Sequence, residues 1–260
     1  MNKYLKIWLL ISRNSFETFA HYRFGALVFF IGKIARFLFF LLFIIFLTAK
    51  VKFLSGYNIW QVLLIYMTFN FIDASTQMLF REVYRFKQHI ITGNFDLLLV
   101  KPVNVLFRLL LGGTDLLDFI TLLPFIIILV FIISKLQYFS LLGILTYIIL
   151  IINSLVIAAS FHIFVMALAV ITTEVDNAIM IYREVTGMGK FPIEIYKEPI
   201  RSFITFIIPV GVMMTIPVKA ISGLVSPPLI SGCIFVGGLL LFISIKVWKE
   251  ALKRYTSASS

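Results

Sequence analysis

Residues 81–108, REVYRFKQHIITGNFDLLLVKPVNVLFR, form a polar break in the first half of an otherwise apolar chain. Only Glu82 and Asp96 oppose the basic residues of this break, which are Arg81, Arg85, Lys87, Lys101 and Arg108. Gly93 and Pro102 belong to residue types that end or redirect helices. We therefore expect this segment to connect two apolar helices and to be the place where the protein contacts a partner.

The apolar runs on both sides of the break are typical of a helical membrane protein. Of the 260 residues, 61% are hydrophobic and 13% are charged, whereas about a quarter of the residues in soluble domains are charged. Several runs approach or exceed the ~20 residues that a helix needs to cross a bilayer. The strands of a β-barrel would alternate apolar and polar residues, and these runs are continuous. The sequence therefore predicts an all-α membrane protein without a large soluble domain.

We predict six transmembrane helices in one domain that covers residues 25–248. The predicted spans are residues 25–48, 58–80, 106–133, 140–171, 200–217 and 229–247. Residues 1–24 precede them as an amphipathic helix with basic residues near one face, and residues 249–260 follow as a tail. A helix of this kind lies in the plane of the membrane interface. The alternative is a plain cytoplasmic lead into the first span.

The distribution of Lys and Arg predicts the orientation of these spans. Seventeen of the 23 basic residues fall at the two chain ends and in the segments 81–108 and 183–201, whereas the intervening connections hold four. Cytoplasmic loops carry the excess of basic residues, so we expect both termini and the loops 81–104 and 172–201 to be cytoplasmic. Residues 218–228 would then form a short outward loop. The net charge of +11 follows this pattern, and we expect no nucleic acid as a partner.

Charged residues inside the predicted spans are candidate functional residues, because a charge within a bilayer is costly and needs a partner. Five of them fall at similar depth, and they are Lys33, Arg36, Asp73, Asp115 and Asp118. We expect an intramembrane layer of ion pairs in which Lys33 or Arg36 pairs with Asp73 or Asp115. The alternative is that these side chains extend toward the cytoplasmic interface.

Patterns that would indicate catalysis or metal binding are not recognisable. The fragment GMGKF at residues 187–191 lacks the leading Gly and the final Ser or Thr of a phosphate-binding loop. The histidines His21, His89 and His162 lack metal-ligand spacing, and we expect His162 to pack between helices or line a cavity. The lone Cys233 excludes an intramolecular disulfide. We therefore predict no catalytic, cofactor-binding or metal site.

Two blocks of sequence resemble a known family. The stretch GNFDLLLVKPVN at residues 93–104, which follows a Glu and a short predicted helix, resembles the signature of ABC-2-type permeases. The stretches FPIEIYKEPIR at residues 191–201 and FIIPVGVMMTIPVKAISG at residues 206–223 agree with the same family. Six spans with both ends in the cytoplasm are also the plan of that family, and the resemblance covers nearly the whole chain.

The resemblance implies the permease subunit of an ATP-driven exporter in a prokaryotic plasma or inner membrane. Such a permease pairs with a second permease subunit, as a homodimer or a heterodimer, and with a separate ABC subunit that binds ATP. The chain itself would need no cofactor. We expect an amphipathic or hydrophobic substrate because the predicted interior is apolar and weakly charged. The residues alone leave open an ATP-independent carrier or channel, or a membrane-embedded enzyme.

The resemblance also implies a coupling helix between spans two and three, at about residues 81–92, that docks the ATP-binding subunit. Gly93 would end this helix in the left-handed conformation, and Asn94 would begin the next turn. The residues expected to form the coupling site are Glu82, Arg85, Phe86, His89, Gly93, Asn94, Phe95 and Asp96.

Overall fold

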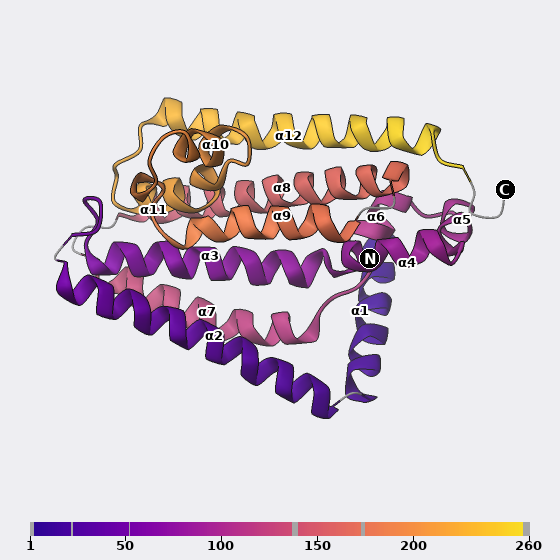
Figure 1. Cartoon of the computed structure of the whole chain (residues 1–260), viewed down its shortest axis with the longest axis horizontal. Coiled ribbons are helices and arrows are strands. Elements are labelled where there is room, and N and C mark those ends of the chain that lie inside the picture. The colour runs from indigo at the N-terminus through magenta and orange to yellow at the C-terminus, as the bar shows by residue number, and fades with distance from the viewer. Residues whose placement is uncertain (1–2, 22, 52, 137–139, 173–174, 257–260) are drawn as a thin grey trace.

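The computed structural model describes residues 3–21, 23–51, 53–136, 140–172 and 175–256, and the described chain is helical almost throughout (Figure 1). Five long helices lie along one axis: α2 (Arg23–Lys50), α3 (Ile59–Leu79), α7 (Leu116–Ser134), α8 (Leu141–Thr172) and α12 (Pro227–Lys253). Within the described residues, these five are long and apolar enough to cross a membrane. The predicted all-α class is confirmed, and helices of membrane length lie at the first, second, fourth and sixth predicted spans.

Helix α3 is the centre of the bundle. Its residues 62–69 are all buried, because α2, α7 and α8 pack around it. Asn58 begins the helix with a reciprocal cap, in which its side chain accepts from the Gln61 N–H and the Gln61 side chain accepts from the Asn58 N–H, both at 3.0 Å. Such a cap satisfies two backbone donors that the first turn leaves without a partner.

Helices α8 and α12 pack closely along their length. Asn153 of α8 donates a hydrogen bond of 2.9 Å to the carbonyl oxygen of Cys233 on α12. One turn further along α12, Gly237 faces the Asn153 side chain so closely that a Cβ atom has no room there. A buried polar group in an apolar region needs such a partner, so this contact fixes the register of the two helices.

The predicted third span is wrong at its start. A short helix, α6 (Val105–Leu110), ends before Gly112 and Gly113, and α7 begins only at Leu116. The Asp115 carboxylate caps α7 by accepting from the backbone N–H groups of Leu117 at 2.9 Å and Asp118 at 3.3 Å. The two glycines and the cap break the apolar run that the sequence analysis had treated as continuous.

The predicted fifth span, residues 200–217, is not one straight helix. It contains α10 (Ile200–Phe206), a π-helical turn η4 (Gly211–Thr215) and the start of α11 (Ile216–Ile221), and the two halves meet at a bend of 69°. Pro209 lies at the bend, where its missing N–H cannot support a helix. The Ser154 hydroxyl, midway along α8, donates to the Met213 carbonyl at 2.9 Å, so η4 reaches into the middle of the bundle.

The segment before α10 runs the length of the bundle, so the prediction that residues 172–201 form a loop on one side is wrong. This segment contains α9 (Val175–Gly187) and two short 3-10 helices, η2 (Met188–Lys190) and η3 (Ile193–Ile195). Near its start, Asp176 pairs with Lys87 at 3.0 Å; near its end, Glu194 pairs with Lys219 at 2.5 Å. Helix α9 lies alongside α8 (Figure 1).

In the described chain, six segments thus run along the bundle: α2, α3, α7, α8, residues 175–196 and α12. We call the end that holds residues 81–108 and the last turns of α12 the terminal end. Helix α1 (Lys3–His21) lies across this end, crosswise to the long helices (Figure 1). It is held there by a hydrogen bond of 2.6 Å between Ser12 and Thr114 and by the Tyr4 ring against Phe107.

Candidate functional site

The predicted coupling helix is two short helices in the structure. A 3-10 helix, η1 (Arg81–Arg85), leads directly into α4 (Phe86–Ile91), and a third short helix, α5 (Asn94–Leu99), follows. Gly93 separates α4 from α5 with a φ of +71°, which only glycine adopts without strain. The expected left-handed backbone conformation of Gly93 and the helix start at Asn94 are therefore confirmed.

The apolar side chains of this segment are fixed to α12. Phe86 and Phe95 are fully buried, pack edge to face at 5.1 Å and lie 6.1 and 6.5 Å from the Trp248 ring. The Phe95 ring also contacts Tyr255 at 4.8 Å. These two phenylalanines therefore join α4 and α5 to the last helix, and they are not free to contact another protein.

Glu82 ties η1 to its neighbours. Its side chain is only 7% exposed, and its carboxylate lies 3.0 Å from His89 Nε2, 3.5 Å from Arg108 Nη1 and 3.6 Å from Arg85 Nη1. Burial acts to raise the pKa of Glu82, but the hydrogen bond from His89 and the nearby positive charges outweigh it and hold the pKa below its usual range. The cluster thus connects η1 with α4 and α6.

The outer face of the same segment is apolar and exposed. Ile91, Leu97 and Val100 present large hydrophobic side chains to the outside, and Val100 is 81% exposed. Arg85 and Asn94 are exposed beside them, and Asp96 is half-buried. This set of residues at 85–100 forms a mixed apolar and polar surface at the terminal end, which we call the terminal-end surface.

The predicted layer of intramembrane charges has different pairs from those expected. Lys33 pairs with Asp118, and both side chains are largely buried. Asp115 pairs instead with Arg81 at 3.2 Å, near the terminal end. Among the described residues, neither Lys33 nor Arg36 forms the expected ion pair with Asp73 or Asp115. That prediction is wrong for Lys33 because Asp118, one helical turn deeper in α7, reaches it across the bundle.

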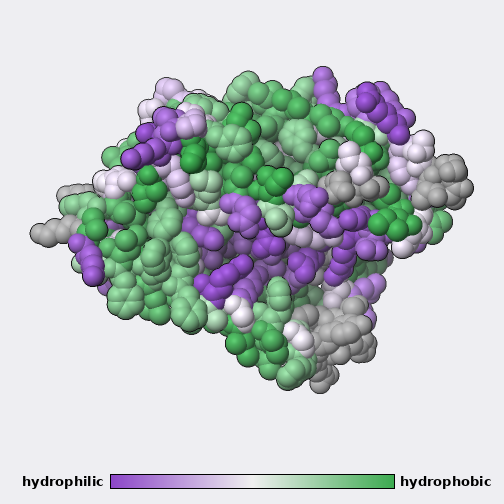
Figure 2. All heavy atoms as spheres, viewed as in Figure 1, coloured by the Kyte–Doolittle hydropathy of each residue, from purple (hydrophilic) through white to green (hydrophobic). Residues whose placement is uncertain are grey.

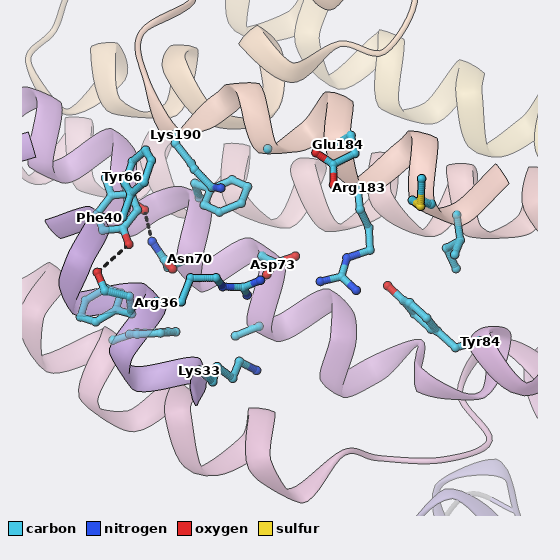
Figure 3. A pocket seen from close by; sticks show the side chains of 17 residues that line it. Lys33, Arg36, Phe40, Tyr66, Asn70, Asp73, Tyr84, Arg183, Glu184 and Lys190 are labelled. Atoms are coloured by element: carbon cyan, nitrogen blue, oxygen red, sulfur yellow. Dashed lines mark hydrogen bonds between the residues drawn. The ribbon is translucent and has the colours of Figure 1, made fainter. Parts of the chain in front are cut away.

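The two remaining residues of that layer, Arg36 and Asp73, line a cavity of about 390 Å³ (Figure 3). It lies midway along α2, α3 and α7, at Arg36, Asn70 and Phe125. Its other wall is formed by α9 and η2, which contribute Arg183, Glu184 and Lys190. The cavity is therefore at the depth of the membrane centre if the long helices span the bilayer.

One part of the cavity is aromatic and the other is charged. The aromatic residues are Phe37, Phe40, Tyr66, Phe69 and Phe125. The Lys190 ammonium lies over the faces of Phe40 and Phe69, at 5.1 and 5.4 Å from the ring centroids. Arg36, Asp73 and Arg183 converge from α2, α3 and α9 (Figure 3). Such a cavity suits a ligand with an apolar body and a charged group.

Arg183, Glu184 and Lys190 are not among the candidate residues predicted from the sequence, because they fall in the predicted cytoplasmic loop 172–201. A signal was nevertheless present in α9, where Val175, Ile179, Tyr182 and Thr186 are buried. Their spacing of three or four residues marks one face of a helix. Helix α9 therefore has one face for packing and another on which charged residues lie beside the cavity.

His162 packs within the bundle, as expected. Its ring is fully buried and lies near the rings of Phe80, Tyr84 and Tyr182. Its Nδ1 donates to the Ala158 carbonyl at 2.8 Å. His162 therefore has a packing role where the side chains of Phe80, Tyr84 and Tyr182 meet.

Comparison with known families gave one match. A family model described as ABC-2 family transporter protein matches residues 10–259. The searches of curated proteins and of solved structures found no match.

Proposed function

Since this chain belongs to the ABC-2 family of transporter proteins, we propose that it is the permease subunit of an exporter in a prokaryotic cell membrane. It moves an amphiphilic substrate outward, and a separate subunit binds and hydrolyses ATP. The observation that carries this proposal is the cavity of about 390 Å³ midway along the long helices. A cavity that combines charged and aromatic side chains at this depth is the expected site for a transported molecule.

We propose that the terminal-end surface docks the ATP-binding subunit. Its exposed apolar side chains, Ile91, Leu97 and Val100, are of the kind that protein interfaces bury. Phe86 and Phe95 connect α4 and α5 to Trp248 of α12, and Glu82 connects η1 to α6. Movement of the docked subunit would therefore displace α12 and α6 together, as rigid bodies.

A second permease subunit is proposed to cover the cavity. Figure 2 shows that hydrophilic residues gather over α9 and the adjacent part of α3, between regions of apolar surface. Lipid tails cannot satisfy charged groups at this depth, whereas a second subunit with its own polar face can. The substrate path would then run between the two copies, or between this chain and a related permease.

We propose that the terminal end faces the cytoplasm. Lys and Arg residues of α1, of residues 81–108 and of the last turns of α12 lie at this end. The opposite end has fewer, among them Lys50, Lys135 and Lys219. This distribution follows the positive-inside rule, and the amphipathic character of α1 supports a position in the plane of the cytoplasmic interface.

Co-purification with the ATP-binding subunit tests the proposal. We expect a soluble ATPase encoded beside this gene to bind the detergent-solubilised wild type. The double variant Leu97→Asp/Val100→Asp is expected to lose the ATPase, because it places two charges in an apolar interface, whereas Leu224→Asp, exposed near the opposite end, is expected to keep it. Equal capture by all three proteins would refute docking at this surface, and absence of any bound ATPase would refute the exporter assignment.

A further inference from the structure

Within the described part of the chain, three positively charged side chains of the cavity have no ion-pair partner. Arg36 of α2, Arg183 of α9 and Lys190 of η2 all line the cavity. None of the three has a carboxylate within 4.0 Å among the residues that the structure describes. The fourth base of the cavity, Lys33, is already paired with Asp118. The cavity thus presents three cations whose charge the protein does not neutralise by contact.

The acidic residues of the cavity do not balance these cations. Of the residues that the structure describes, Asp73 and Glu184 are the acidic ones that line it. Asp73 accepts a hydrogen bond of 2.7 Å from Gln77, and Glu184 is exposed. Counted over the described residues, two cavity carboxylates therefore face three cations that form no ion pair. The cavity carries a net positive charge at a depth where an uncompensated charge is costly.

We propose that the cavity binds anionic amphiphiles, with the acidic head group, a carboxylate or a phosphate, held by Arg36, Arg183 and Lys190. Guanidinium groups bind such anions through paired, charge-assisted hydrogen bonds. The apolar part of the ligand packs against Phe37 and Phe125, which line the same cavity. This assignment rests on the proposed permease function and specifies the substrate class of its cavity.

The aromatic residues argue against a cationic substrate. An ammonium head group is recognised by the faces of aromatic rings. Here the Lys190 ammonium already lies over the Phe40 and Phe69 rings, at 5.1 and 5.4 Å. A second cation would meet Lys190, Arg36 and Arg183 at close range, whereas an anion would be attracted by all three.

The proposal is tested by the binding of a fluorescent fatty acid, 11-(dansylamino)undecanoic acid, to the purified protein in phosphatidylcholine nanodiscs. Empty nanodiscs correct for partitioning of the probe. We expect dodecanoate and dodecyl phosphate to displace the probe, and dodecanol and dodecyltrimethylammonium to displace it at least about tenfold less well, since each charged hydrogen bond accounts for a factor of this size. Displacement by only one of the two anions would still support the site and would identify its head group.

Variants separate the effect of charge from loss of folding. Arg36→Gln, Arg183→Gln and Lys190→Gln are each expected to raise the probe Kd about tenfold. Lys135→Gln, which removes an exposed base near the opposite end, is the matched control and leaves the Kd unchanged. Asp73→Asn removes a negative charge from the same cavity, so the Kd stays equal or falls. Misfolding would instead weaken probe binding whether the substitution removes a positive or a negative charge.

Two outcomes would overturn the proposal. One is displacement by dodecanol or dodecyltrimethylammonium as effective as by dodecanoate, and the other is wild-type affinity in all three Gln variants. Neither outcome affects co-purification of the ATP-binding subunit, so the permease function would survive. Conversely, anion binding without any ATPase partner would support the site and refute the exporter.

Discussion

The substitution Glu82→Gln tests whether one buried carboxylate holds the proposed coupling segment to the bundle. It keeps the shape of the side chain and removes its charge. The carboxylate lies 3.0 Å from His89 Nε2 and 3.5 Å from Arg108 Nη1, and its side chain is 7% exposed. The neutral amide can still contact His89 but loses its attraction to Arg108. We therefore expect destabilisation that comes mainly from the Arg108 contact.

The size of the effect follows from these distances. At an effective dielectric constant of about 20, two unit charges ~3.5 Å apart attract by about 5 kcal/mol before desolvation is subtracted. Arg85 adds less than about 1 kcal/mol, because its side chain is 60% exposed. Arg108 keeps a hydrogen bond of 2.9 Å to the Gly112 carbonyl, so the variant does not leave it without any partner. We expect Glu82→Gln to lower the free energy of unfolding by about 2–3 kcal/mol, below the range for a fully buried pair.

Equilibrium unfolding in mixed dodecylmaltoside–SDS micelles, followed by circular dichroism, measures this loss. Arg108→Gln is expected to cost about 2 kcal/mol and Arg85→Gln less than about 1 kcal/mol. The double variant Glu82→Gln/Arg108→Gln should cost less than the two single changes together, because the shared contact is lost once. A cost below about 1 kcal/mol for Glu82→Gln, or an equal cost for Arg85→Gln and Arg108→Gln, would refute the reasoning.

Three further predictions concern other contacts. First, the stability difference between wild type and Glu82→Gln depends on pH, because the pKa of Glu82 is lowered in the folded protein. The difference is fully present above the unfolded pKa of about 4.3 and is lost as the pH falls through the folded pKa. An undiminished difference at pH 3 would contradict this. Trp248→Ala should lower the free energy of unfolding by about 3–5 kcal/mol, because Trp248 is 3% exposed and contacts Phe86 and Phe95. Trp8→Ala, on partly exposed α1, is the control, and an equal loss of stability in the same unfolding assay would contradict this prediction. Gly189→Ala should lower the free energy of unfolding by about 1–3 kcal/mol, because a Cβ there would lie 2.6 Å from Met214 Cγ and 2.8 Å from Val210 Cγ1. Gly238→Ala, where a Cβ would meet no atom within 4 Å, is the control. An equal loss of stability in both variants would contradict the packing argument.

The long helices could be predicted because continuous apolar runs leave few alternatives. The runs of α2, α3, α8 and α12 have no helix break inside the predicted spans. The predicted bounds lie within two residues of the helix ends, except that α12 continues past residue 247 to Lys253. The turn at Gly93 was also predictable, since its left-handed φ of +71° is a local requirement. The start of α7 was not predicted, because Leu110 and Leu111 continue the apolar run up to Gly112, and hydropathy alone does not register a cap such as Asp115.

The ion pairs could be predicted only as a group. Lys33, Asp115 and Asp118 lie within apolar runs, where a charge is costly, and this position can be read from the sequence. Which carboxylate Lys33 meets depends on how α2 and α7 are rotated, and Asp115 and Asp118 are only one turn apart. The cap at Asp115 turns this side chain toward the terminal end, where it meets Arg81, and leaves Asp118 for Lys33.

Helix α9 shows why hydropathy fails where a transport site is expected. Arg183, Glu184 and Lys190 lower the average hydropathy of this segment, and the sequence analysis therefore assigned it to the cytoplasm. Its buried residues nevertheless contact α8, and its charged residues line the cavity. A helix with this division of faces is stable inside a membrane only if its polar face meets something other than lipid. The charged residues that lower the hydropathy of α9 are thus also the reason to expect a polar ligand and a second subunit beside it.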